Sequence, residues 1–141
     1  MVTPFGEKVN IQRGRYLRLS VNSMAEETKP TTVEEISFEY FEKLDIRVGK
    51  VVEAEAVPQS KKLLKMQVDF GTEKRQCIAG LQKYYKPEEV VGKKFVFLLN
   101  LRRRMIAGSE SQAMVLAAED AAGVVSVLQP EKDVAEGAKI G

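Results

Sequence analysis

The chain has 141 residues, a net charge of +2, one cysteine and no histidine. Its length suits one domain with a modest core, and 44% hydrophobic with 30% charged residues is typical of globular proteins. The missing histidines exclude His-based acid–base catalysis, a Ser-His-Asp triad and His-containing zinc sites. A single cysteine excludes a disulfide within the chain.

The sequence contains no apolar run long enough to span a bilayer. It also lacks a basic start followed by an apolar core and a small-residue cleavage site. We therefore expect a cytoplasmic protein with no membrane partner.

The first 35 residues differ in composition from the rest. Residues 1–23 carry four basic residues and one acid, and their pattern predicts two short strands. This N-terminal extension is either a hairpin added to the domain or a non-native leader. Residues 24–35 carry four acids and one lysine, which indicates an acidic linker. The main domain is therefore expected to occupy residues 36–141.

A short helix is predicted at the start of this domain. Ser37 is placed to cap it, in a sequence that resembles the start of a capping box. Phe38, Phe41 and Leu44 recur at helical spacing. We expect the face that they form to pack on the β-barrel predicted from the strands that follow.

Residues 45–71 hold two runs of alternating apolar residues around one polar, basic loop. In the second run Leu64, Met66, Val68 and Phe70 share one parity, which predicts a half-buried strand. In the first run the alternation is interrupted beside Gly49, which predicts a bulge or bend there. A long strand bent at a glycine suits the corner of a small closed barrel.

More short elements follow in the second half of the chain. Cys77 lies in a strand-like run and is expected to be a buried apolar side chain rather than a reactive thiol. Many short strands with regularly spaced turns predict a small barrel or sandwich. The expected elements are strands at 75–79, 95–99, 113–118 and 124–128, a short helix at 86–92 and a basic loop at 100–110.

Several motifs occur in a fixed order: Asp-Ile-Arg-Val-Gly at 45–49, Pro-x-x-x-Lys-Leu at 58–63, Val-Asp-x-Gly at 68–71 and Ile-Ala-Gly-Leu at 78–81. Together they resemble the tRNA-binding domain of the methionyl-tRNA synthetase beta-subunit type, over residues 36–141. The resemblance implies an all-β fold, an OB-fold barrel with short helices and additional C-terminal strands. Such barrels bind nucleic acids on one strand face and its flanking loops.

Lys61 and Lys62 lie in the loop between the first two predicted strands. Adjacent lysines on a loop can approach phosphate oxygens as mobile point charges. The resemblance favours a tRNA-binding role for them. The alternative is an ordinary solvated turn.

Arg102, Arg103 and Arg104 follow a predicted buried strand. A loop could present all three guanidinium groups to a phosphate chain, which their forked geometry suits. The family is basic at this place too, which favours tRNA binding. The alternative is a charged surface loop with no ligand.

Ser111, Gln112 and Met114 resemble the family pattern Ser-x-Gly-Met, with Ala113 in place of glycine. A hydroxyl and an amide can read a base edge, and a thioether can pack under a base. The alternative is the start of a strand with Met114 in the core. Tyr84 and Tyr85 present a similar choice between base stacking and packing.

The resemblance implies a non-catalytic module that binds tRNA and assists aminoacylation, with no cofactor, no metal and no catalytic residue. Its implied partners are tRNA and a methionyl-tRNA synthetase catalytic chain. We also expect a homodimer, because the apolar strand 124–128 has more apolar surface than one barrel face covers. The alternative function is that of a secretion-chaperone-like protein that binds unfolded polypeptides on the same fold.

Overall fold

The computed structural model of the protein describes residues 33–141. The predictions for residues 1–23 and for most of the linker lie outside the described residues. Residues 33–37 belong to the first of two compact units and form no helix or strand. The second unit, Phe38–Gly141, contains every described element.

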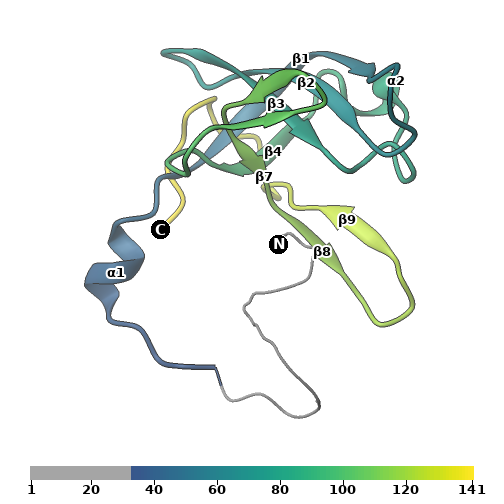
Figure 1. Ribbon diagram of the computed structural model, residues 1–141. Helices are drawn as coiled ribbons and strands as arrows, with labels where there is room; N and C mark the ends of the chain where they lie inside the picture. The colour runs from purple at the N-terminus through teal and green to yellow at the C-terminus, as the bar shows by residue number, and fades with distance from the viewer. Residues whose placement is uncertain (1–32) are drawn as a thin grey trace. The chain divides into compact units, whose positions relative to one another are not determined.

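The second unit is built on a nearly closed antiparallel barrel, drawn in Figure 1. Its strands run in the order β3-β2-β1-β4-β7. The predicted all-β, OB-like fold with short helices and extra C-terminal strands is confirmed. The barrel strands are β1 (Ile46–Ala56), β2 (Leu64–Asp69), β3 (Lys74–Ala79), β4 (Lys94–Leu98) and β7 (Met114–Val115).

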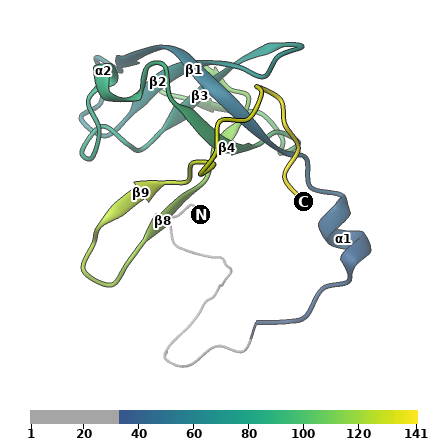
Figure 2. The same ribbon diagram turned by 180° about the vertical axis from the view of Figure 1, so that it is seen from behind.

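The remaining strands form two separate hairpins. One pairs β5 (Arg104–Ile106) with β6 (Ser109–Ser111), and the other pairs β8 (Ala117–Glu119) with β9 (Val125–Val127). Figures 1 and 2 show the β8–β9 hairpin projecting away from the barrel.

The helices are short, as predicted. They are α1 (Phe38–Glu42) and α2 (Pro87–Val90). The backbone N–H of Lys86 donates to the Glu89 carboxylate at 2.7 Å, which closes one half of a capping box at the start of α2. Within residues 33–141 no helix is long and apolar enough to cross a membrane.

The core follows the alternation of the sequence. In β2 the residues Leu64, Met66 and Val68 are fully buried, and their neighbours are only partly so. The apolar run 95–99 is buried on both faces, as its lack of alternation predicted. Cys77 is also fully buried, and this burial raises the pKa of its thiol to about 12, so it is a packing residue as expected.

The bulge expected beside Gly49 lies elsewhere in β1. The glycine pairs in register with Phe95, and the irregularity in β1 lies between Val51 and Glu53. A Cβ at Gly49 would lie 2.5 Å from side-chain atoms of both Val68 and Phe70. Glycine is therefore needed here for close packing across the barrel, while the bulge shifts the inward-facing positions from Val51 to Ala54.

The basic loop predicted at 100–110 is another correction, because most of it forms the β5–β6 hairpin. The turn uses Ala107 at φ 52° and Gly108 at φ 82°. Two successive positive φ angles are typical of a type I′ turn, which matches the twist of a two-residue hairpin. An alanine is unusual at the first position, so the turn has only a weak sequence signal.

The helix packing predicted for α1 is also wrong. No residue of α1 is buried, and 66% of Phe38 is exposed. Phe38 and Phe41 stack on one another, with ring centroids 6.2 Å apart. Among residues 33–141, therefore, little covers the apolar face of α1.

The C-terminal residues are fixed along β1. The N–H of Val48 donates to the carbonyl of Ala138 at 2.9 Å, and that of Ile140 donates to Ile46 at 2.8 Å. The first half of β1 is thereby hydrogen-bonded to β4 on one side and to the tail on the other. This pairing covers a strand edge that would otherwise be open.

We predict that Gly49→Ala destabilises the domain by about 1–3 kcal/mol, because the added methyl group overpacks against Val68 and Phe70. Urea unfolding measures the change. Gly80→Ala is the matched control, since the nearest atom to its Cβ would be 4.0 Å away. Equal stability of Gly49→Ala and wild type would contradict the packing account.

Candidate nucleic-acid interface

The first basic segment is the loop between β1 and β2. Lys61 and Lys62 are exposed there, and within residues 33–141 neither makes an ion pair. The backbone beneath them is fixed, because the Gln82 side chain donates to the carbonyls of Ser60 at 3.1 Å and Leu63 at 2.6 Å. The N–H of Gln82 also donates to the Lys62 carbonyl at 3.1 Å. The loop thus holds two mobile charges on an ordered backbone.

The second basic segment leads into the β5–β6 hairpin. Arg102, Arg103 and Arg104 are all exposed. Arg103 forms the one ion pair recorded for these three arginines among the described residues, with Glu110 at 3.7 Å. Arg104 begins β5 and lies opposite Ser111. All three guanidinium groups can therefore be reached from solvent, which phosphate binding requires.

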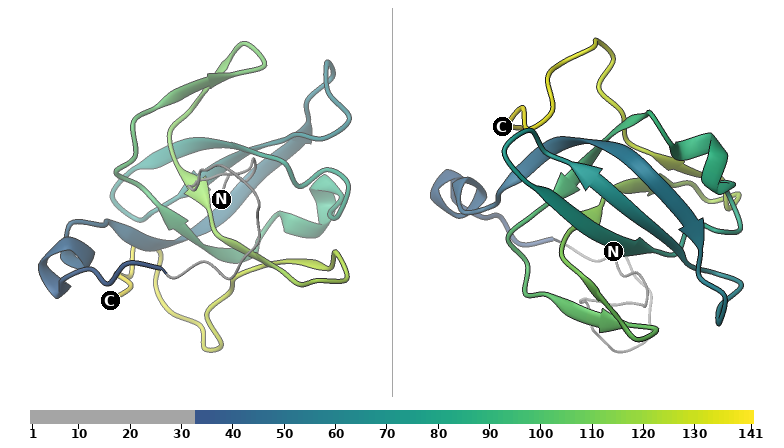
Figure 3. Two further views of the ribbon diagram at one scale, coloured as in Figure 1. Left: turned by 60° about the horizontal axis from the view of Figure 1, so that its bottom comes forward. Right: turned by 90° about the horizontal axis from the view of Figure 1, so that it is seen from above.

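The lysine loop and the turn of the β5–β6 hairpin lie at the same end of the barrel. Leu64, which follows the lysine loop, pairs with Ala79 at the end of β3. Residues 112 and 111 lie beside Gln76 and Ile78 in antiparallel order, so the hairpin turn extends toward that same end. Both views of Figure 3 show the β1–β2 loop and the hairpin projecting on one side. Arg102, Arg103 and Arg104 stand at the base of this hairpin, so both basic segments belong to elements that project on this side.

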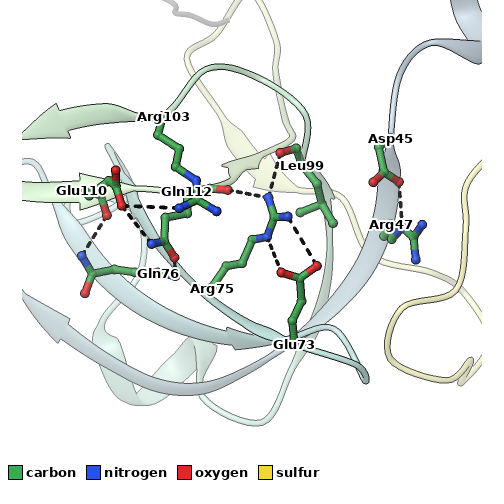
Figure 4. Close-up of polar contacts among 9 residues, drawn as sticks. All are labelled: Asp45, Arg47, Glu73, Arg75, Gln76, Leu99, Arg103, Glu110 and Gln112. Atoms are coloured by element: carbon green, nitrogen blue, oxygen red, sulfur yellow. Dashed lines mark hydrogen bonds and ion pairs between the residues drawn. The ribbon is translucent and has the colours of Figure 1, made fainter.

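Ser111 and Gln112 have structural partners in this arrangement. The Ser111 hydroxyl accepts a hydrogen bond from the Ile78 N–H at 3.1 Å, and Ser111 is only 8% exposed. The Gln112 side chain accepts from the Gln76 N–H at 3.0 Å and donates to Glu110 at 3.0 Å. These polar groups join β3 to the base of the hairpin, as Figure 4 shows for Gln112.

Met114 and the tyrosines lie near the barrel rather than on the hairpin. Met114 is partly buried in β7 and pairs with Leu98. The Tyr85 hydroxyl accepts from the Val127 N–H at 3.1 Å, and its ring packs against the core. Tyr84 is 46% exposed and is the tyrosine of this pair that can stack on a base.

The sequence analysis does not single out Arg75, a β3 residue that contacts the base of the hairpin. Its guanidinium donates to the carbonyls of Leu99 at 2.9 Å and Gln112 at 3.1 Å. It also pairs with Glu73, with a nitrogen–oxygen distance of 3.0 Å. These contacts are drawn in Figure 4. A lone arginine in a short strand gives no sequence signal of such a role.

The acidic side chains lie apart from the two basic segments, except for Glu110. Within residues 33–141 no group of three or more acidic or cysteine side chains could hold a metal ion. A shallow hollow of about 430 Å³ lies over β1 and β2, and its carboxylates would repel a phosphate chain. Its lining residues are Val52, Glu53, Ala54, Glu55, Lys65, Gln67 and Val91.

Comparison with known proteins identifies the family. Residues 46–139 match the family model described as "Putative tRNA binding domain". The chain belongs to this tRNA-binding domain family. The match covers the whole barrel, both hairpins and most of the C-terminal tail.

Relatives of this tRNA-binding domain include much longer proteins. A methionine–tRNA ligase of Methanocaldococcus jannaschii is 52% identical over 116 residues, which are 82% of this chain and 18% of that protein. The chain therefore spans less than a fifth of the length of that relative. It corresponds to the tRNA-binding domain portion.

Two solved structures are similar over their full length. A MetRS-related protein from Pyrococcus horikoshii is 38% identical, with a TM-score of 0.74, and the match covers 77% of this chain and 100% of that one. The chaperone CsaA from Bacillus anthracis is 34% identical, with a TM-score of 0.69 and the same coverages. The domain thus resembles both a synthetase-related protein and a chaperone.

We predict that Ala107→Gly stabilises the tRNA-binding domain by about 0.5–1 kcal/mol, because glycine adopts a positive φ without the penalty of a Cβ. Thermal unfolding measures the gain. Gly108→Ala, at the other turn position, should have the opposite sign. A loss of stability in Ala107→Gly would contradict the turn geometry.

Proposed function

We propose that this chain is a non-catalytic tRNA-binding module that delivers tRNA to a methionyl-tRNA synthetase catalytic chain in the cytoplasm. The observation that carries the proposal is that two exposed basic segments belong to a loop and a hairpin that project on one side of the barrel. Residues 36–141 are the binding domain, preceded by an acidic linker at 24–35 and an extension at 1–23. Binding by a separate module raises the local concentration of tRNA near the catalytic chain.

The proposed contacts divide into two kinds. Lys61, Lys62, Arg102, Arg103 and Arg104 meet phosphates, which supplies affinity and orientation. Met114 packs against a base. Ser111 and Gln112 use the hydrogen-bonding capacity left after their contacts with β3 to bind RNA. Because the charge of the RNA phosphates dominates the affinity, binding should be strongly salt-dependent and should follow the shape of tRNA.

We predict that Lys61→Gln with Lys62→Gln weakens binding of bulk tRNA roughly tenfold. Each lost phosphate contact should lower the slope of log Kd against log salt by about one. Fluorescence anisotropy at several salt concentrations measures both quantities. Lys93→Gln with Lys132→Gln is the matched control, since it removes the same charge from exposed lysines outside the two segments.

Wild-type protein that does not bind tRNA even at low salt would refute the proposed function. An equal loss in the control pair would show that net charge matters and that the location of the lysines does not.

The second candidate is a chaperone role. It is favoured by the similarity to CsaA and by the open apolar face of α1. A chaperone would suppress aggregation of an unfolded protein at high salt, and Arg102→Ala, Arg103→Ala and Arg104→Ala together would leave that activity intact. The tRNA-binding proposal expects the opposite dependence, because its affinity comes from charge.

We also propose a homodimer through the C-terminal strands, with α1 nearby. On the β8–β9 hairpin Val124 is 62% exposed and Leu128 is 42% exposed, and Phe38 on α1 is 66% exposed. A two-fold pairing would bury the same apolar surface on both chains. It would also offer two basic ends to one tRNA, so that neither needs high affinity alone.

For the dimer, we predict a mass of twice 15.8 kDa by light scattering at micromolar concentration. Val124→Glu with Leu128→Glu should give monomers, because the introduced charges would be buried without partners. Val91→Glu is the control, at an exposed valine outside both apolar surfaces. A wild-type monomer would refute the dimer.

A further inference from the structure

The Arg75 side chain joins the barrel to both ends of the loop that carries the arginine segment. Leu99 precedes this segment and Gln112 follows it, and the same guanidinium nitrogen of Arg75 donates to both carbonyls, at 2.9 and 3.1 Å. Residues 100–111 therefore form a loop whose base is closed by Arg75. This loop contains Arg102, Arg103, Arg104 and the whole β5–β6 hairpin.

The contacts from Arg75 to Leu99 and Gln112 form a clamp, and the Arg75 side chain is itself held in place. The other side of the Arg75 guanidinium faces Glu73, whose carboxylate accepts at 3.0 Å and 3.4 Å. The Arg75 side chain is only 18% exposed, whereas that of Arg103 is 51% exposed. With its donors committed to protein acceptors, Arg75 is poorly placed to bind RNA itself.

Further contacts extend the clamp along the hairpin. Gln76, the next residue of β3, donates from its side chain to the Glu110 carbonyl at 2.8 Å. Glu110 in turn accepts from Gln112 and pairs with Arg103. Figure 4 shows this continuous set of contacts running from Glu73 to Arg103.

We propose that Arg75 is a positioning residue for RNA binding, which fixes the arginine segment 102–104 without contacting RNA. The inference rests on the proposed tRNA-binding function. The physical reason is that ordering a loop before binding removes a conformational cost that the complex would otherwise carry. Without these contacts the three arginines would keep their charge but lose the fixed backbone that carries them.

Two substitutions separate this role from a direct one. Arg75→Met removes the hydrogen bonds and the charge. Arg75→Lys keeps the charge but loses the planar fork that reaches two carbonyls and a carboxylate together. A direct electrostatic role would leave tRNA affinity intact in Arg75→Lys, whereas a positioning role predicts a loss in both variants.

Arg47→Met is the matched control. Arg47 pairs with Asp45 two residues earlier at 2.7 Å, as Arg75 pairs with Glu73, and this pairing raises the pKa of the Arg47 guanidinium. The Arg47 side chain donates to Asp45 and not to the hairpin. In Figure 4 it points away from the hairpin. Arg47→Met therefore removes the same charge and the same type of ion pair as Arg75→Met, without breaking the contacts to Leu99 and Gln112.

The experiment combines hydrogen exchange with tRNA affinity in a mutant cycle. We expect Arg75→Met and Arg75→Lys to accelerate amide exchange in residues 100–112 and to weaken tRNA binding about tenfold, equivalent to ~1.4 kcal/mol. In a background with Arg102, Arg103 and Arg104 changed to alanine, Arg75→Met should weaken binding less than about twofold, because the positioned groups are gone. Arg47→Met should show neither effect.

Unchanged exchange in residues 100–112 would overturn the proposal. So would a Kd that Arg75→Met leaves unaltered, or that it weakens by the same factor in both backgrounds. A triple-alanine variant that binds tRNA as tightly as wild type refutes the proposed RNA contacts, and with them the RNA-positioning role. In that case faster exchange in Arg75→Met would still establish the clamp as a structural feature.

Discussion

The structure depends on which groups accept hydrogen bonds from the backbone N–H groups at the open edge of β3. Alternate N–H groups of this strand face the seam of the barrel, where β7 has only two residues and cannot supply a full ladder. The Gln76 N–H is taken by the Gln112 side chain, and the Ile78 N–H by the Ser111 hydroxyl. Buried backbone donors left without acceptors would be costly, so these side chains substitute for a missing strand. The seam also fixes where the β5–β6 hairpin begins and ends.

This closure connects the fold to the proposed binding surface. The residues that complete the barrel are the ones from which the arginine segment extends, and Arg75 closes the base of that segment. On the neighbouring loop Gln82 has an equivalent role, since it fixes the backbone beneath Lys61 and Lys62. In both places an ordered polar contact supports exposed positive charge. Such an arrangement suits a ligand that is recognised by its backbone phosphates and its shape.

The sequence predicted what periodicity and charge encode. The alternation in β2 identified its buried face, and the unbroken apolar run of β4 identified a strand covered on both sides. It failed where geometry is set by distant contacts. The sequence indicates a bulge or bend at Gly49, but only the folded barrel brings Val68 and Phe70 against it. The apolar spacing of α1 suggested packing on the barrel, yet a pattern does not reveal which surface covers it. Arg75 and Gln82 were missed because their partners lie far away in the sequence.

An NMR titration of tRNA into the labelled protein tests the account most directly, because it locates the binding surface without substitutions. If the two basic segments bind tRNA, the amide signals of residues 59–63 and 102–110 change first and most. Signals from the acidic surface around Glu53 and Glu55 should change little. Changes centred on that surface, with the two basic segments unaffected, would contradict the account.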